Sequence, residues 1–395
     1  MAISRKLQQQ MAEGGWIRKM FEEGITLKRR FGESNVFDLS LGNPVMEPPE
    51  EFRRELRRWV NYPIAGMHRY MPNAGYPETR AAVAEHISSM TGLSFTQNEI
   101  VMTCGAAGGI NVTLKTIVEA GEEVLIFAPY FVEYIYYIDN VQAIPRIVPT
   151  DSQFAPDLKI LEENITSKTR AVLVNSPNNP TGVVYGHDIL KGIGELLGRK
   201  EVEYGREIFL ISDDIYRRLI YDGAECPYVF QYHPRAIVVT SYSKDLALPG
   251  ERIGYVAVNP QYSGRDELVN GLVFCNRVLG FVNAPALMQN VVKSLQHASV
   301  DVDQYVKKRD LLYNSLVEMG YSIVKPMGAF YIFPESPIED DVAFVKELQK
   351  YNVLVVPGRG FGAPGYFRIS YCLEDWVIEG SLPGFRAAAK DFGLC

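Results

Sequence analysis

The sequence predicts an α/β protein with a mostly parallel central sheet, helices on both faces of that sheet, and a smaller α+β C-terminal domain. Between about residues 99 and 258, short β-branched runs alternate with segments of helical length. These runs are apolar almost throughout, which is typical of strands that are covered on both faces. The chain has 395 residues, 47% of them hydrophobic, and is therefore long enough for two lobes.

Each apolar run is expected to form one strand of the central sheet. The predicted strands are Glu99–Thr103, Val124–Phe127, Ala171–Val174, Ile208–Ile211, Ile237–Thr240 and Ile253–Val258. After residue 285 the pattern changes and predicts a long amphipathic helix over Pro285–Met319. Short strands are expected around Ala329–Ile332 and Phe367–Ser370, and these elements form the smaller domain.

The composition argues against several classes of function. A net charge of −7 does not suit a surface that follows nucleic-acid phosphates. The five cysteines never form a C-x-x-C pair and the five histidines lack metal-ligand spacing, so neither a disulfide framework nor a metal site is predicted. Because no signal peptide and no membrane-spanning run is recognised, we expect a cytoplasmic protein that does not associate with membranes.

Residues that could bind a ligand or take part in catalysis follow the predicted strands. In open α/β sheets, ligands bind beyond the carboxyl ends of the strands, so these residues are expected to line one cleft. The segments are Gly105–Gly109, Pro129–Phe131, Asn175–Gly182, Asp213–Tyr216 and Ser241–Lys244.

Lys244 is unusual because it lies between two apolar runs and beside Ser241 and Ser243. A lysine in a desolvated pocket has a lowered pKa and becomes a nucleophile toward carbonyl groups. Pyridoxal phosphate would also use the other segments, since its phosphate, ring nitrogen and ring face require an anion site, a carboxylate and an aromatic.

Other interpretations of these segments are weaker. The glycine turn at 105–109 is neither G-x-G-x-x-G nor a Walker A loop, and taken alone it could be a plain turn. Asp213-Asp214 resembles the end of a Walker B strand, but the chain contains no phosphate loop to accompany it. Ser241-x-x-Lys244 matches the S-x-x-K of penicillin-binding enzymes, yet no K-T-G or S-D-N partner occurs.

Taken together, the motifs resemble fold-type I, class I/II pyridoxal-phosphate-dependent aminotransferases of the aspartate aminotransferase superfamily, along nearly the whole chain. The matching motifs are Ser40–Pro44, Tyr70–Gly75, Asn178–Gly182, Asp213–Tyr216, Ser241-x-x-Lys244 followed by Arg252, and Phe367–Ser370. The resemblance implies an N-terminal segment (1–45) that joins the small domain and the substrate mouth. It also implies a large cofactor-binding domain (46–285) and a small C-terminal domain (286–395).

The resemblance also implies roles at the cofactor ring. Lys244 is expected to form the Schiff base, or internal aldimine, with pyridoxal 5'-phosphate and then to move a proton. Asp213 is expected to pair with the ring nitrogen, and Tyr216 and Asn179 with the phenolic oxygen. Phe131 occupies the position of the aromatic that stacks on the ring.

The remaining expected site residues bind phosphate or substrate. Arg368 is expected to bind the substrate α-carboxylate bidentately, with help from Asn179 and the backbone at Gly42. Tyr70 would reach the phosphate from a neighbouring subunit, which implies a homodimer. The phosphate site of one subunit is expected to comprise Gly105, Ala106, Ala107, Ser241, Ser243 and Arg252.

The resemblance implies a ping-pong transfer of the amino group of an L-amino acid to a 2-oxo acid. A carbon–sulfur β-lyase on the same cofactor is the alternative. A cofactor-binding regulator is disfavoured, because only about 45 residues precede the large domain and a fused DNA-binding module needs more. The substrate side chain is left open, since Ala106-Ala107 offers only backbone and the lysine that some aspartate-specific relatives use is missing.

Overall fold

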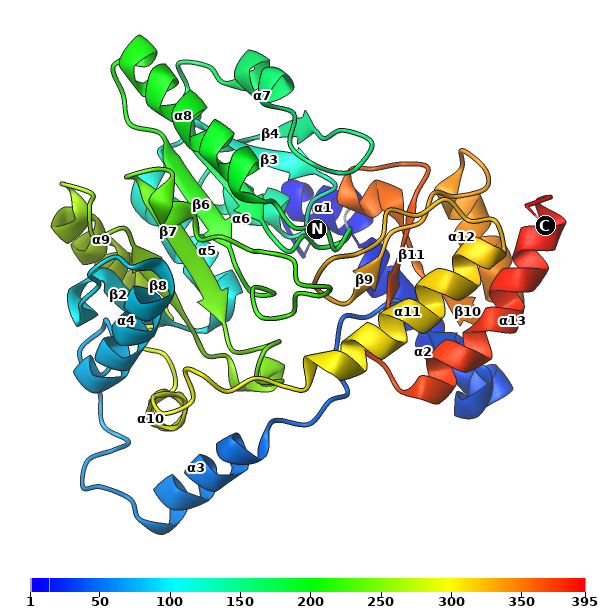
Figure 1. The fold of residues 1–395 in the computed structure, drawn as a ribbon, viewed down its shortest axis with the longest axis horizontal. Helices are drawn as coiled ribbons and strands as arrows, with labels where there is room; N and C mark the ends of the chain where they lie inside the picture. The colour runs from blue at the N-terminus through cyan, green and yellow to red at the C-terminus, as the bar shows by residue number, and fades with distance from the viewer. Residues whose placement is uncertain (1, 14, 395) are drawn as a thin grey trace.

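The structure, a computed structural model, describes residues 2–13 and 15–394, without the side chains of residues 12, 13, 17 and 18. Within these residues the central sheet has seven strands, and only β8 runs antiparallel to its neighbours. The predicted, mostly parallel sheet is therefore confirmed (Figure 1). In spatial order the strands are β2 (Ile100–Thr103), β8 (Gly254–Val258), β7 (Ala236–Ser241), β6 (Phe209–Asp213), β5 (Thr169–Asn175), β3 (Glu123–Ala128) and β4 (Ile144–Pro149).

Both faces of this sheet are buried, as the apolar runs predict. Alternate residues of one strand enter different cores: Val172 packs with the helices on one face and Leu173 with those on the other. The first face is covered by α4 (Pro77–Thr91), α7 (Leu158–Asn164), α8 (His187–Tyr204) and α10 (Ala286–Val292). The second face is covered by α5 (Gly105–Ile117), α6 (Tyr134–Asn140) and α9 (Arg265–Val278).

Strand β4 is not among the predicted strands. Its sequence, Ile144-Pro-Arg-Ile-Val-Pro149, contains two prolines, which cannot donate to a sheet ladder. Because β4 is an edge strand paired only with β3, the prolines are tolerated there.

The predicted helix over Pro285–Met319 is wrong as a single element. The structure divides it into α10 and α11 (Val302–Glu318), joined by an irregular linker at residues 293–301. The Asp301 side chain caps α11 by accepting a hydrogen bond from the Asp303 amide. The Arg218 guanidinium donates to the carbonyls of Gln296 and Ala298, so these groups bind a side chain instead of continuing a helix.

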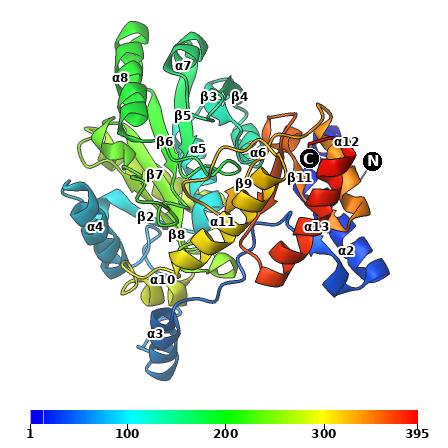
Figure 2. The same cartoon turned by 45° about the vertical axis from the view of Figure 1, so that its right-hand side comes forward.

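The smaller lobe is α+β, and it includes a strand from the N-terminal segment. Helix α11 leads from beside the sheet to this lobe (Figure 2), and β1 (Phe37–Asp38) pairs in parallel with β10 (Val353–Leu354). The Ser40 and Gly42 backbone therefore follows directly from a strand of the small lobe. The other elements of the lobe are β9 (Tyr331–Ile332), β11 (Val356–Pro357), β12 (Phe367–Ser370), α12 (Asp341–Lys350) and α13 (Asp375–Asp391).

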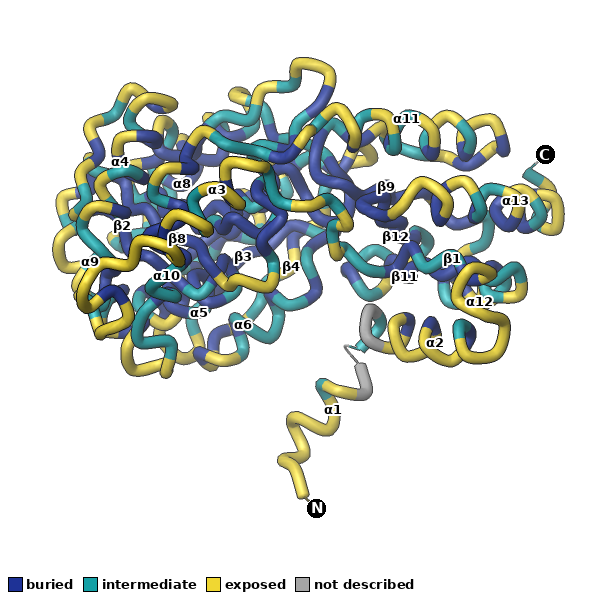
Figure 3. The backbone as a smooth tube through the Cα atoms, turned by 90° about the horizontal axis from the view of Figure 1, so that it is seen from below, coloured by how far each residue is buried: buried dark blue, intermediate teal, exposed yellow. Residues whose placement is uncertain are grey.

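Three further helices lie outside the elements named so far. The first, α1 (Arg5–Glu13), is exposed along most of its length (Figure 3), and its Gln10 side chain donates to Asp139 of α6 at 2.8 Å. The others are α2 (Trp16–Phe31) and α3 (Glu50–Asn61). Among the helices of residues 2–13 and 15–394, none is both long and apolar enough to span a membrane.

Candidate active site

Lys244 lies in the loop after β7, and its side chain points toward the N-terminal segment. Its Nζ donates to the Gly42 carbonyl at 2.8 Å and lies 5.2 Å from the centre of the Phe330 ring. Burial lowers the pKa of the Lys244 amine to about 8. At pH 7 about a tenth of this amine is therefore in the unprotonated form that a nucleophilic lysine requires, far more than for a lysine of ordinary pKa.

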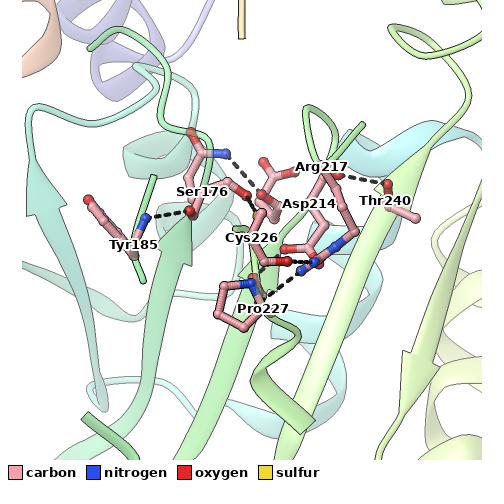
Figure 4. Close-up of polar contacts among 10 residues, drawn as sticks. Ser176, Tyr185, Asp214, Arg217, Cys226, Pro227 and Thr240 are labelled. Carbon is pink, nitrogen blue, oxygen red and sulfur yellow. Dashed lines mark hydrogen bonds and ion pairs between the residues drawn. The ribbon is translucent and has the colours of Figure 1, made fainter. Parts of the chain in front are cut away.

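Asp213 is the last residue of β6 and Asp214 follows it, but their surroundings differ. Figure 4 shows Asp214 engaged by Arg217, whose Nε donates to Asp214 Oδ2 at 2.8 Å, while Ser212 Oγ donates to the other Asp214 oxygen. Asp213 is 3% exposed, and its Oδ1 has no hydrogen-bond partner among the described residues. Asp213 is thus the carboxylate that is available to another group.

Burial raises the pKa of Asp213 to about 7, although a hydrogen bond from Tyr134 works against this. The Tyr134 hydroxyl donates to Asp213 Oδ2 at 2.6 Å, which leaves Oδ1 as the free oxygen. A positively charged N–H at Oδ1 would compensate the buried charge, so the site fits a protonated pyridine nitrogen.

Tyr134 belongs to this site, although its role is not predicted from the sequence. It stands three residues after Phe131, and the two rings are T-shaped with centres 5.5 Å apart. The signal available in the sequence was weak, since Tyr134-Ile-Tyr-Tyr137 contains three tyrosines in a chain that has 23.

An anion cradle forms where the first turn of α5 meets Arg252. Helix α5 begins at Gly105, so the amides of Gly105, Ala106 and Ala107 are in its first turn and have no partner within the helix. A Cβ at Gly105 would lie 2.7 Å from Arg252 Nη2, so glycine lets the guanidinium approach the helix end. Arg252 itself has a φ of 52°, a strained value for a non-glycine residue.

Ser241 and Ser243 complete this cradle from the lysine loop. Ser241 pairs across the sheet with Gly254, two residues after Arg252. Its Oγ accepts a hydrogen bond from the Ser243 amide at 3.4 Å, and both serines are buried. Amides, hydroxyls and a guanidinium at one point form the donor set that a phosphate requires.

Tyr216 and Asn179 lie between the two lobes. The Tyr216 hydroxyl is 3.0 Å from that of Tyr331, on the small-lobe strand β9. Asn179 is fixed at its amide, which donates to Asn175 Oδ1 at 2.8 Å. Its own Oδ1 accepts from Arg368 at 3.2 Å, so its side-chain NH₂ group is left for another acceptor.

Arg368 is a buried cation without an acidic partner among the described residues. It is 2% exposed, Nη2 donates to the Ser40 carbonyl at 2.6 Å, and its Nε has no hydrogen-bond partner there. The guanidinium lies 4.6 Å from the ring centre of Tyr331 and 4.8 Å from that of Phe361. A buried guanidinium held by carbonyls and rings is suited to an incoming carboxylate.

Gly42 is required by close packing. A Cβ at this position would overlap the Tyr331 hydroxyl. The absence of a side chain lets the Gly42 carbonyl reach Lys244.

Tyr70 is the expected site residue that the structure places apart from this cluster. It is 90% exposed and lines a surface groove with Phe281 and Asn283. This groove lies beside the cradle, since Cys104, which precedes α5, contacts the Asn283 carbonyl.

Comparisons with known proteins agree with this geometry. The family described as aminotransferase class I and II matches residues 34–379. A probable aspartate aminotransferase of Methanocaldococcus jannaschii is 32% identical over 88% of this chain and 92% of its own length. An aromatic-amino-acid aminotransferase of Thermococcus litoralis is 32% identical over 99% of each chain.

The solved structures agree as well. The crystal structure of an aminotransferase from Eubacterium rectale superposes with a TM-score of 0.95, at 38% identity, and covers 99% of each chain. The family match, the relatives and the fold lead to one conclusion: the chain belongs to the class I and II aminotransferases, which are pyridoxal-phosphate-dependent enzymes.

Proposed function

We propose that this enzyme transfers the amino group of an L-amino acid to a 2-oxo acid in two half-reactions, with pyridoxal 5'-phosphate bound to Lys244. The observation that carries the proposal is the buried guanidinium of Arg368, which lies beside Asn179 and has no acidic partner within the described part of the chain. Both substrates of such a transfer carry a carboxylate next to the reacting carbon. One arginine therefore binds the donor and the acceptor in turn.

Bound pyridoxal phosphate supplies an electron sink for negative charge on the substrate α-carbon. Asp213 would stabilise the positive charge on the ring nitrogen through Oδ1, which accepts no hydrogen bond from any described residue. Lys244 Nζ, with its lowered pKa, removes the α-proton and returns it. Arg368 fixes the carboxylate, so that the α-carbon stays within reach of Lys244.

The proposed working unit is a homodimer in which Tyr70 contributes to the partner's phosphate site. Its support is the exposure of large apolar side chains near Tyr70 and on α9: Tyr62, Ile64, Phe274 and Val278 are 77%, 58%, 55% and 52% exposed. Light scattering should then give twice the chain mass. Tyr70→Phe should weaken cofactor affinity without changing that mass.

Two measurements test the reaction. Borohydride reduction of the holoenzyme, followed by peptide mapping, should place a pyridoxyl label on Lys244. Addition of one amino acid without an acceptor should convert the bound cofactor stoichiometrically to its amine form and release one 2-oxo acid. Sustained release of pyruvate and ammonia from cystathionine would instead identify the β-lyase.

A further inference from the structure

A second polar cluster lies beside the lysine loop. We call it the Arg218 cluster, and it comprises Arg218, Asp245, His86 and the linker carbonyls of Gln296 and Ala298. It borders a small cavity of about 30 Å³ that Tyr242 also lines. None of these residues has a role in the proposed reaction, yet Asp245 follows Lys244 directly in the chain.

Arg218 is the centre of this cluster. Its Nη1 donates to the Ala298 carbonyl at 2.5 Å, and its Nη2 donates to the Gln296 carbonyl. Nη2 also lies 3.0 Å from His86 Nε2 on α4. Its Nε lies 3.8 Å from Asp245 Oδ2. One side chain thus joins the lysine loop, helix α4 and the 293–301 linker between α10 and α11.

A second contact joins the same two segments through the backbone. The Val300 amide in the linker donates to the Asp245 carbonyl at 2.7 Å. Asp245 is therefore held at its backbone by the linker and at its carboxylate by Arg218. The residue that follows Lys244 in the chain therefore has little freedom to move.

The charges in the cluster are consistent with an attraction between Arg218 and Asp245. The Asp245 side chain is 14% exposed, and burial raises its pKa to about 6 while Arg218 works against that rise. Burial, followed by the charge of Arg218, lowers the pKa of His86 to about 4. His86 is thus neutral near pH 7, and its Nε2 must accept from the guanidinium, which has no acceptor atom. Arg218 is the only described cation that lies close to the Asp245 carboxylate.

We propose that Arg218 is a positioning residue for Lys244, acting through Asp245 and the 293–301 linker. The inference rests on the proposed role of Lys244. Arginine suits this role because its planar fork binds two carbonyls and faces a carboxylate at once, which lysine cannot do. Removing it would leave the carbonyls of Gln296 and Ala298 without their donor and Asp245 without its cation.

The test is hydrogen exchange in the apoprotein. It measures how well the backbone amides of the lysine loop are protected, and the result does not depend on the proposed cofactor chemistry. In Arg218→Met, peptides covering 241–252 and 294–301 should exchange about tenfold faster, while β5 stays protected. In the holoenzyme kcat should fall about tenfold with KM changed less than about threefold, because Arg368 is untouched. If borohydride does not label Lys244 in the wild-type holoenzyme, the proposed chemistry is refuted, but the exchange result still tests the positioning role of Arg218.

Arg309→Met is the matched control. Arg309, which is fully buried, also binds a carboxylate and a carbonyl, those of Asp222 and Pro326, but it belongs to helix α11. Its loss should not accelerate exchange at 241–252. Equal acceleration in both variants, or none in Arg218→Met, would overturn the proposal. If Arg218→Met does not fold, Arg218→Lys should show intermediate exchange at both peptides, and wild-type exchange there would equally refute it.

Discussion

The buried Asp213 carboxylate is expected to lower the free energy of unfolding of the apoprotein, and the substitution Asp213→Asn measures this effect. Burial raises the pKa of Asp213 from 3.8 to about 7 in the chain without cofactor. Because the folded pKa is above the unfolded one, ionisation destabilises the native state. The penalty is absent below about pH 4, grows between the two pKa values, and is complete above about pH 7. At about 1.4 kcal/mol per pKa unit, it reaches about 2 kcal/mol at pH 5.5 and about 4 kcal/mol at pH 8.5.

Asn removes the charge, keeps the shape, and still accepts from Tyr134, so the Asp213→Asn apoprotein should be more stable than the wild type. For 395 residues, 4 kcal/mol corresponds to a rise in melting temperature of about 5 °C. Circular dichroism of the two apoproteins at pH 5.5 and 8.5 measures this. With pyridoxal phosphate added, the advantage should shrink or reverse, because the ring nitrogen then compensates the wild-type charge.

Asp214→Asn is the matched control. Both oxygens of Asp214 are already bound, to Ser212 and Arg217, so this change should destabilise the apoprotein at either pH. An Asp213→Asn apoprotein that is less stable than the wild type at pH 8.5, or whose advantage does not grow with pH, would refute the reasoning.

Three more predictions concern the reaction. Lys244→Ala should abolish turnover and borohydride labelling while still binding the cofactor non-covalently, and full activity would contradict the mechanism. In the wild-type apoprotein, the rate of cofactor attachment should rise with pH around a midpoint near 8, the pKa of Lys244, and a midpoint near 10.5 would show an unperturbed amine. Arg368→Lys should raise KM and lower kcat for every amino acid tested because bidentate orientation is lost, and unchanged kinetics would remove Arg368 from the site.

Periodicity predicted the sheet well, because strands covered on both faces are apolar without interruption. It failed where local signals conflict with tertiary structure. The prolines of β4 argue against a strand, and only its edge position, which no local pattern shows, permits one. At the break between α10 and α11, the Ala298 carbonyl accepts a hydrogen bond from Arg218, a residue 80 positions earlier in the chain that no local pattern could reveal as its partner.

The site was predicted where a motif carries the chemistry and missed where only packing does. Lys244, Asp213 and Arg368 stand in motifs. In the structure Lys244 and Arg368 donate to the neighbouring carbonyls of Gly42 and Ser40, and Asp213 keeps one oxygen without a hydrogen bond among the described residues. Tyr134 supports Asp213 from a helix 79 residues away, and Tyr331 on β9 shapes the backbone at Gly42, almost 290 residues earlier in the chain. Aromatic residues are common in this chain, so spacing alone could not single these two out.

The pairing of β1 with β10 has a practical consequence for recombinant work. A shortened gene that starts at residue 46, the expected start of the large domain, would omit the edge partner of β10. It would also omit the carbonyls of Ser40 and Gly42, which receive Arg368 and Lys244. Such a fragment would lack part of the candidate site even if it remained in solution, so expression plasmids should retain the first 45 codons.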